Sequence, residues 1–359
     1  MPGSPSGAHV RAKMRQNRQI SCKTIKFRTK IAGVLRNFLP KTPMPSTSQP
    51  LPAPPKEPPP LSWGAAIALL MLLNVVWGAN WPNTKYLVQH IPPFWVVAIR
   101  TVLATGIVFL LQLLTRQLVR PPRHDLPVIL STSLLHMAMY GALMCIGLQY
   151  INAGQSAVLG YTTPLWVAPA AWFFLKEPMP ALRIAGVVLG LLGIAILFDP
   201  FTTDWATGNT LMGNGILLFA ALIWAVCIII LRQHKWQASP FQLTSWQLLL
   251  ASCVLVPVAW VVEGPLHVTL TPKLLAMNLY NGVIVTALGF WCMSIINRSL
   301  PATTTSLGSL GTPLVGIISA QVFLQEPLEW PLIIGTGMIL TGVALGVFCS
   351  TEKKRDTPA

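Results

Sequence analysis

The stretch TTPLWVAPAAWFFLKEP at residues 162–178 is matched by GTPLVGIISAQVFLQEP at residues 311–327. A constant shift of 149 aligns the prolines and the glutamates of the two stretches, and it also aligns glycines that follow them. Further upstream, a shift of 147 places Trp77 on Trp224. The chain is therefore predicted to contain two related halves, which we place at residues 62–199 and 212–350.

The composition places both halves in a membrane. Of the 359 residues, 53% are hydrophobic and 10% are charged, whereas soluble proteins carry about 25% charged residues. This excludes soluble enzymes, nucleic-acid-binding proteins and secreted disulfide scaffolds. A membrane-spanning helix needs about 20 mostly apolar residues, and such runs are too long for barrel strands. We predict an all-α membrane protein with ten transmembrane helices, at residues 63–82, 93–115, 126–148, 154–174, 181–199, 212–231, 241–262, 273–296, 303–324 and 331–350.

Five spans per half is an odd number, so the second half is predicted to enter the membrane from the opposite side to the first. Basic residues mark alternate joints between spans, and the joints on the other side carry only Lys85 and Lys273. The positive-inside rule therefore predicts two inverted five-helix repeats with both termini in the cytoplasm. The basic joints contain Arg116, Arg120, Arg123, Lys176, Arg183, Arg232, Lys235 and Arg298.

The two tails are expected to lie outside the fold. Residues 1–61 are basic and Pro-rich, which is typical of disorder, and we interpret them as a disordered cytoplasmic tail. A true start at Met44 and an organelle transit peptide are the other two interpretations. Residues 351–359 are predicted to form a cytoplasmic C-terminal tail.

Inverted repeats are typical of secondary transporters, whose substrate site lies near the midplane between the halves. Arg100 falls well inside the second predicted span, where a charge is costly unless it faces a cavity or a partner. His136 lies inside the third span with Tyr140 one turn further on, and its imidazole is a candidate for proton coupling. The full set of candidate substrate-binding residues is Trp77, Asn80, Asn83, Arg100, Tyr140, Gln155, Tyr161, Trp224, Trp246, Gln247 and Asn281.

Other residues are assigned to structure and movement. Pro164 and Pro313 interrupt equivalent spans and are the predicted hinge for alternating access. Glu177 and Glu326 are expected to pin helix ends. Glycines spaced as GxxxG in the fifth and tenth spans predict close packing, either within the bundle or in a homodimer.

Several residues and motifs carry a resemblance to a known family. WGANWPNTKYL at residues 77–87, IPPFWVVAIR at residues 91–100 and the two repeated blocks resemble the EamA-type branch of the drug/metabolite transporter superfamily. The resemblance implies a ten-helix, five-plus-five fold that exports or exchanges small metabolites, such as amino acids or amphipathic drugs. It also implies a multi-pass protein of the plasma membrane, which is the inner membrane in bacteria.

The sequence favours a transporter over an enzyme. It contains no HExxH, GxSxG or nucleotide-binding loop, and no Cys or His spacing that indicates a metal. We therefore expect no catalytic residues, no metal, no cofactor and no nucleic-acid partner; the expected partners are a small-molecule substrate and the bilayer. The alternatives are a membrane-embedded lipid-modifying enzyme and a membrane assembly partner that transports nothing.

Overall fold

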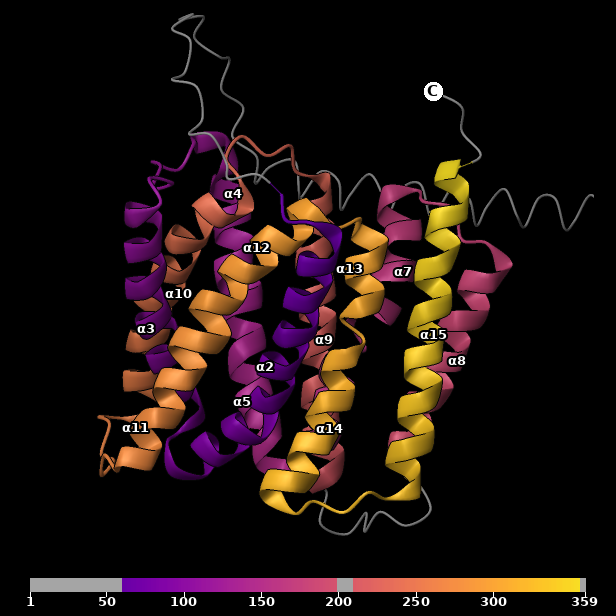
Figure 1. The fold of residues 1–359 in the computed structure, drawn as a ribbon. Coiled ribbons are helices and arrows are strands. Elements are labelled where there is room, and N and C mark those ends of the chain that lie inside the picture. Colours follow the sequence, from indigo (N-terminus) through magenta and orange to yellow (C-terminus); the bar gives the residue numbers. More distant parts are fainter. Residues whose placement is uncertain (1–59, 199–208, 356–359) are drawn as a thin grey trace, which may run out of the picture. The chain divides into compact units, whose positions relative to one another are not determined.

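The computed structural model describes residues 60–198 and 209–355, which fold as helices joined by short connections (Figure 1). Most of the predicted N-terminal tail lies outside these residues, as do residues 199–208 and 356–359. Within the described ranges, nine helices are long and apolar enough to cross a membrane, and α8 is a shorter apolar helix of 17 residues. The prediction of an all-α membrane protein with ten spans is confirmed.

Each half contributes five spans. The spans of the first half are α2 (Trp63–His90), α3 (Pro93–Leu114), the continuous run of η1 (Arg123–Asp125), α4 (Leu126–Ser131), η2 (Thr132–Tyr140) and α5 (Gly141–Tyr150), the pair α6 (Ala153–Gly160) and α7 (Thr163–Leu175), and α8 (Ala181–Leu197). The spans of the second half are α9 (Asn209–Gln233), α10 (Pro240–Glu263), the run of α11 (Pro272–Leu279), η3 (Tyr280–Leu288) and α12 (Gly289–Ser299), the pair α13 (Ala302–Gly308) and α14 (Gly311–Leu324), and α15 (Trp330–Arg355).

The fourth and ninth spans are each divided into two helices. The first breaks at Tyr161 and Thr162, and the second at Ser309 and Leu310. Each break comes just before the proline that the sequence indicates as a hinge. Discontinuous helices of this kind free backbone groups near the middle of a transporter. The same spans end alike, because Lys176 (φ 56°) and Gln325 (φ 57°) adopt the left-handed conformation that closes a helix.

Two π-helices also occupy matching positions. The segments η2 and η3 are nine residues each, and they lie in the third span and the eighth span, which are equivalent in the two repeats. A π-helix bonds each residue to the fifth along the chain, is rare, and is frequent at functional sites. Nothing in the hydrophobic pattern predicts these segments, so they are a feature that the structure adds.

Helices of the two halves pack mainly against each other. Helix α2 packs on α14, α3 on α10, α5 on α9, and α8 on α15. Figure 1 shows the last pair side by side at one edge of the bundle. Glycines make this contact close, since an added Cβ on Gly342 would meet the carbonyl oxygen of Gly186. The glycine faces of the fifth and tenth spans therefore pack on one another within a single chain.

The two ends of the bundle are chemically distinct. The end where α3 stops and α4 begins, at the top of Figure 1, carries the basic joints, and we call it the basic end. We call the other one, where α2 stops and α11 begins at the bottom of the same view, the opposite end. Helix α2 extends beyond its expected end at residue 82 and reaches His90, because Pro82 is accommodated inside it. Lys85 therefore belongs to the helix and not to a joint.

Candidate functional site

Arg100 lies in the middle of α3 with part of its guanidinium unsatisfied. The side chain is half-buried, while its Nε atom is fully buried and has no hydrogen-bond partner. Among the described residues, the ion pairs involve His124, Asp125, Glu177 and their partners, and none involves Arg100. A charged donor without a counter-ion in such a place is costly. The arginine is thus available to an anion.

The guanidinium fits against the third span because a glycine leaves room for it. A Cβ added to Gly141 would meet Nη2 of Arg100 at 2.8 Å. Gly141 directly follows η2, so the π-helix ends where the arginine passes. Segment η3 approaches the same place from the other repeat, since a Cβ added to Gly282 would lie 3.3 Å from the Arg100 carbonyl oxygen. Both π-helices therefore border α3 at this arginine.

Aromatic rings surround the same region. The imidazole of His136 stacks on the indole of Trp224, with ring centroids 3.6 Å apart and an angle of 21° between the planes. Tyr140 lies 5.5 Å from His136 and 6.4 Å from Trp224, measured between centroids, and Phe290 lies 6.5 Å from His136. Arg100 lies beside these rings, because its guanidinium passes Gly141, the residue that follows Tyr140. Four of the predicted residues are therefore brought together from three spans, and we call Arg100, His136, Tyr140 and Trp224 the central cluster.

Helix α2 is joined to the π-helix of the second repeat by polar side chains. The indole of Trp77 donates to the Val285 carbonyl at 3.0 Å. Nδ2 of Asn83 donates to the Met277 carbonyl and to Oδ1 of Asn80, both at 3.3 Å. Asn281, which is buried within η3, donates to Thr84 at 3.5 Å. The predicted residues on the first and eighth spans thus meet each other along one interface between the repeats.

The helix breaks also meet α2. At the break of the fourth span, a Cβ added to Gly160, next to Tyr161, would meet the Trp81 ring of α2 at 2.7 Å. Thr312 lies at the start of α14, next to the break of the ninth span. The Thr312 hydroxyl donates to Oδ1 of Asn74 at 2.8 Å, and the Asn74 amide donates to the Gly308 carbonyl at 2.8 Å. The sequence indicates Tyr161 as a candidate but does not single out Asn74 or Thr312. In the sequence, Asn74 and Thr312 can be recognised only as polar residues inside apolar runs.

Three further predicted residues take no part in the contacts described above. Gln155 donates to the Leu197 carbonyl at 2.9 Å and to Asn214 at 3.0 Å. Gln247 is buried on α10. The indole of Trp246 donates to the Val119 carbonyl at 2.9 Å, near the end of α3 remote from Arg100.

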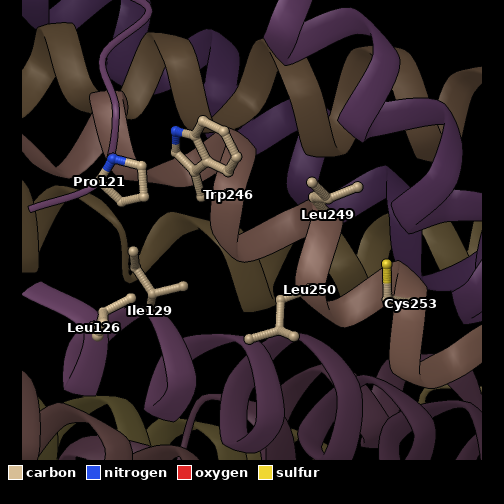
Figure 2. Close-up of a pocket in the computed structure, with 7 residues that line it drawn as sticks. All are labelled: Pro121, Leu126, Ile129, Trp246, Leu249, Leu250 and Cys253. Carbon is tan, nitrogen blue, oxygen red and sulfur yellow. The ribbon is translucent and has the colours of Figure 1, made fainter. Parts of the chain in front are cut away.

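Trp246 lines a groove of its own. Figure 2 shows its indole with six other side chains around an apolar pocket at the basic end. The lining consists of Pro121, Leu126, Ile129, Trp246, Leu249, Leu250 and Cys253. These side chains present carbon and sulfur rather than polar groups to the pocket, so it suits an acyl chain better than a polar metabolite.

Lys85 has a defined structural place at the opposite end. Its ammonium group donates to the carbonyls of Leu148 and Ile151, which end α5. A cation at the C-terminus of a helix is stabilised by the helix dipole and satisfies carbonyls that have no partner within the helix. Lys85 therefore ties the first span to the third, and its ammonium is engaged by backbone.

Two glutamates join the repeats at the opposite end, and we call them the carboxylate latches. Glu263, the last residue of α10, accepts from the backbone N–H groups of Phe94 (3.0 Å) and Trp95 (3.1 Å) at the start of α3. Glu326, just after α14, accepts from Ala153 (2.7 Å) and Gly154 (3.0 Å) at the start of α6. A carboxylate at a helix N-terminus is favourable both as a hydrogen-bond acceptor and towards the dipole.

The basic end is joined differently. Glu177, which is equivalent to Glu326, forms ion pairs with Arg232 at 3.0 Å and with Arg183 at 3.5 Å. Arg232 is exposed, so its ion pair with Glu177 is screened by water, whereas the side chain of Arg183 is largely buried. The equivalent glutamates of the two repeats therefore make different contacts, although the sequence repeat is symmetric.

A comparison with protein families identifies the two halves. A single model, described as the EamA-like transporter family, matches the chain twice, at residues 64–199 and at residues 211–348. Together the two matches cover more than half of the chain. The predicted family resemblance is confirmed.

Curated relatives agree with this assignment. An uncharacterized transporter, YvbV, of Bacillus subtilis is 25% identical over 277 residues, which is 77% of this chain and 90% of the relative. Protein PagO of Salmonella typhimurium is 25% identical over 251 residues, which is 69% of this chain and 82% of the relative. A solved crystal structure matches with a TM-score of 0.57 and 16% identity, covering 82% of this chain and 99% of the other. The last likeness shows the fold alone.

Proposed function

We propose a function from one premise: the chain belongs to the EamA-like transporter family. It is a multi-pass membrane protein and a transporter, and in bacteria such proteins lie in the plasma membrane. We infer that it is a secondary transporter that exports or exchanges a small metabolite without using ATP. The charge pattern of the joints supports a cytoplasmic position for the basic end and for both termini.

The observation that carries the proposal is the unpaired guanidinium of Arg100 within the central cluster. A planar guanidinium presents several N–H donors in a fixed geometry, which suits a carboxylate or a phosphate. The stacked rings of His136 and Trp224 add an apolar surface beside it. We therefore propose that the substrate carries an anionic group bound by Arg100 and an apolar or planar part that contacts the rings.

Movement of the repeats is supported by the broken spans and by the different contacts at the two ends. The breaks before Pro164 and Pro313 allow each half-helix to tilt about a point near the middle of the bundle. The carboxylate latches hold the opposite end, while the basic end is held by the ion pairs of Glu177 and by hydrogen bonds from the Gln237 and Ala238 backbone to the buried Asp125. We propose that the structure represents a state closed at the opposite end, and that release of the latches opens it.

Metabolite profiling of cells provides the test, because the substrate is unknown. Extracts and media are compared for cells that make the wild-type protein, Arg100→Ala, Arg120→Ala or no transporter. Arg120 is an exposed arginine at the basic end and serves as the matched control. We expect an anionic metabolite to redistribute with the wild type and the Arg120 variant but not with Arg100→Ala. Equal redistribution with both variants would remove Arg100 from the proposal.

A further inference from the structure

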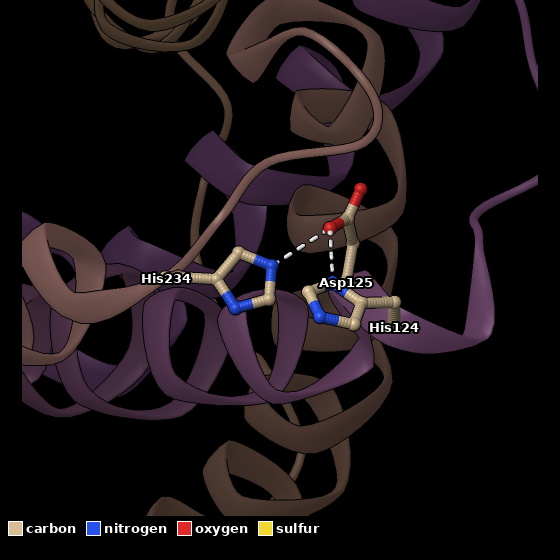
Figure 3. Close-up of side chains that lie close together, drawn as sticks. All are labelled: His124, Asp125 and His234. Atoms are coloured by element: carbon tan, nitrogen blue, oxygen red, sulfur yellow. Dashed lines mark hydrogen bonds and ion pairs between the residues drawn. The ribbon is translucent and has the colours of Figure 1, made fainter.

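Three metal-ligating side chains gather at the basic end, away from the central cluster. His124 and Asp125 lie in η1, at the start of the third span, and His234 follows α9 in the second repeat. One donor atom from each lies within 4.8 Å of the others (Figure 3). His234 is 109 positions from Asp125 along the chain, so no short spacing motif reveals the group.

Asp125 is held in a fixed orientation. Its side chain is completely buried. Oδ2 accepts from the backbone N–H of Ala238 at 2.9 Å, and both carboxylate oxygens lie close to the N–H of Gln237. Oδ1 is directed toward the two imidazoles, as Figure 3 shows. Hydrogen bonds of this kind from the surrounding backbone are what orient a carboxylate ligand in protein metal sites.

The two imidazoles approach the same oxygen from different elements. Nε2 of His234 lies 2.7 Å from Oδ1 of Asp125, and Nδ1 of His124 lies 3.5 Å from it. The two rings are 4.8 Å apart between centroids, and the indole of Trp236 packs edge-on against His234 at 5.8 Å. His234 is largely buried, with a side-chain exposure of 11%, whereas His124 is half exposed at 50%. The group thus has one open side toward solvent.

We propose that His124, Asp125 and His234 bind a divalent zinc-like ion that bridges the two repeats at the basic end. Zn²⁺ binds histidine nitrogen at about 2.0–2.1 Å and carboxylate oxygen at about 2.0–2.2 Å, usually in a tetrahedral set. Tetrahedral ligands at that distance from the ion lie roughly 3.4 Å from one another. The Asp125 oxygen lies 2.7 Å from the His234 nitrogen and 3.5 Å from the His124 nitrogen, so side-chain rotations can enclose the ion. Water from the open side next to His124 supplies the fourth ligand. Zinc bound at Nε2 of His234 replaces the hydrogen bond of this atom to Asp125, and any proton on Nε2 moves to Nδ1 of the same ring or to water.

The neighbouring charges do not prevent this. Arg123 and Lys235 flank the ligands in sequence, but both side chains are exposed, where water and salt screen their charge. Imidazole and carboxylate ligands together favour Zn²⁺ over Mg²⁺ or Ca²⁺, which prefer oxygen donors only. The site therefore selects a borderline metal ion rather than a hard one.

Zinc titration of the purified full-length protein tests the proposal. Thiols are first blocked with N-ethylmaleimide, because free cysteines such as the exposed Cys253 also bind zinc. Binding is followed by competition with a chromophoric zinc chelator for the wild type, His124→Ala, Asp125→Asn and His90→Ala. His90 is an exposed histidine at the opposite end and is the matched control.

We expect one zinc ion per chain in the wild type and in His90→Ala, and an affinity at least about tenfold weaker in His124→Ala and Asp125→Asn. Zinc should also raise the midpoint of thermal unfolding for the first two proteins and not for His124→Ala, because a ligand stabilises the state it binds. The exposed position of His124 allows that variant to fold. Equal zinc affinity in all four proteins would overturn the proposal.

Discussion

Glu326 caps the helix that begins at Ala153, and it does so across the two repeats. Its Oε1 accepts from the Ala153 backbone N–H at 2.7 Å, while Oε2 accepts from the next residue along at 3.0 Å. The equivalent residue of the other repeat, Glu177, is engaged by arginines instead. One sequence motif therefore makes two kinds of contact, and we propose that exchange between them accompanies movement of the halves.

Glu326→Gln is predicted to weaken the latch at the opposite end. The amide keeps the shape of the side chain but removes the charge that favours the helix N-terminus and one of the two acceptor oxygens. We expect a loss of about 1–2 kcal/mol in stability, since charged caps contribute up to about that amount. Thermal unfolding in detergent measures it. Glu329→Gln, at an exposed position in the following connection, should change the midpoint little; an equal shift in both variants would contradict the latch.

Gly141→Ala is predicted to displace Arg100 without changing its charge. The new methyl group would lie 2.8 Å from Nη2 of Arg100, which is the mobile end of a long side chain, so the fold should survive. We expect transport of the anionic substrate to fall at least about tenfold, because a small misplacement of a binding group is costly. Gly106→Ala lies on α3 itself, where an added methyl group meets nothing within 4 Å. Transport should be unchanged in this control, and normal transport in Gly141→Ala would count against the assignment.

His136→Gln is predicted to remove a pH dependence of transport. The imidazole of His136 can bind and release a proton, and a proton carried with an anion neutralises its charge. Wild-type transport is therefore expected to slow as the pH rises and the imidazole loses its proton, whereas the variant should show a flat profile. The measurement is the initial rate in proteoliposomes at several pH values. The same slope in both proteins would show that His136 carries no proton.

Gly342→Ala is predicted to separate α8 from α15. An added Cβ on Gly342 would meet the Gly186 carbonyl and would lie 2.9 Å from the Gly190 nitrogen, and backbone cannot move aside as a side chain can. We expect a destabilisation of about 1–3 kcal/mol, as for other overpacked interfaces. Gly337→Ala, on the same helix with nothing within 4 Å of its added Cβ, is the control. Unfolding midpoints that match in the two variants would refute this role of the glycine contact.

The sequence predicts the spans because a bilayer requires long apolar runs, and those runs are visible in a single chain. It also predicts interruptions at Pro164 and Pro313, since proline removes a backbone hydrogen bond. It does not predict contacts between spans, such as that of Glu263 with Phe94, which depend on the rotation and relative height of each helix. Helices that are apolar on every side, such as α7, carry little information about which face turns inward.

Part of the candidate site can also be predicted, because polar and bulky residues inside an apolar run are visible in a single chain. Arg100, His136 and Trp224 are identifiable as costly or bulky groups within apolar runs, and the structure places them together. Trp246 has the same appearance in the sequence, yet its indole faces an apolar groove near Val119. The group of His124, Asp125 and His234 is not visible in the sequence because its members come together only when the two repeats pack.

The paired π-helices bear on the origin of the chain. A π-helical turn arises when one residue is inserted into an α-helix. Such an insertion rotates the side chains of all later residues of that helix to a different face. One insertion before the gene duplication that produced the two halves accounts for both π-helices, whereas insertion after the duplication requires two separate events. On that account, the ancestral five-span protein already had this distortion.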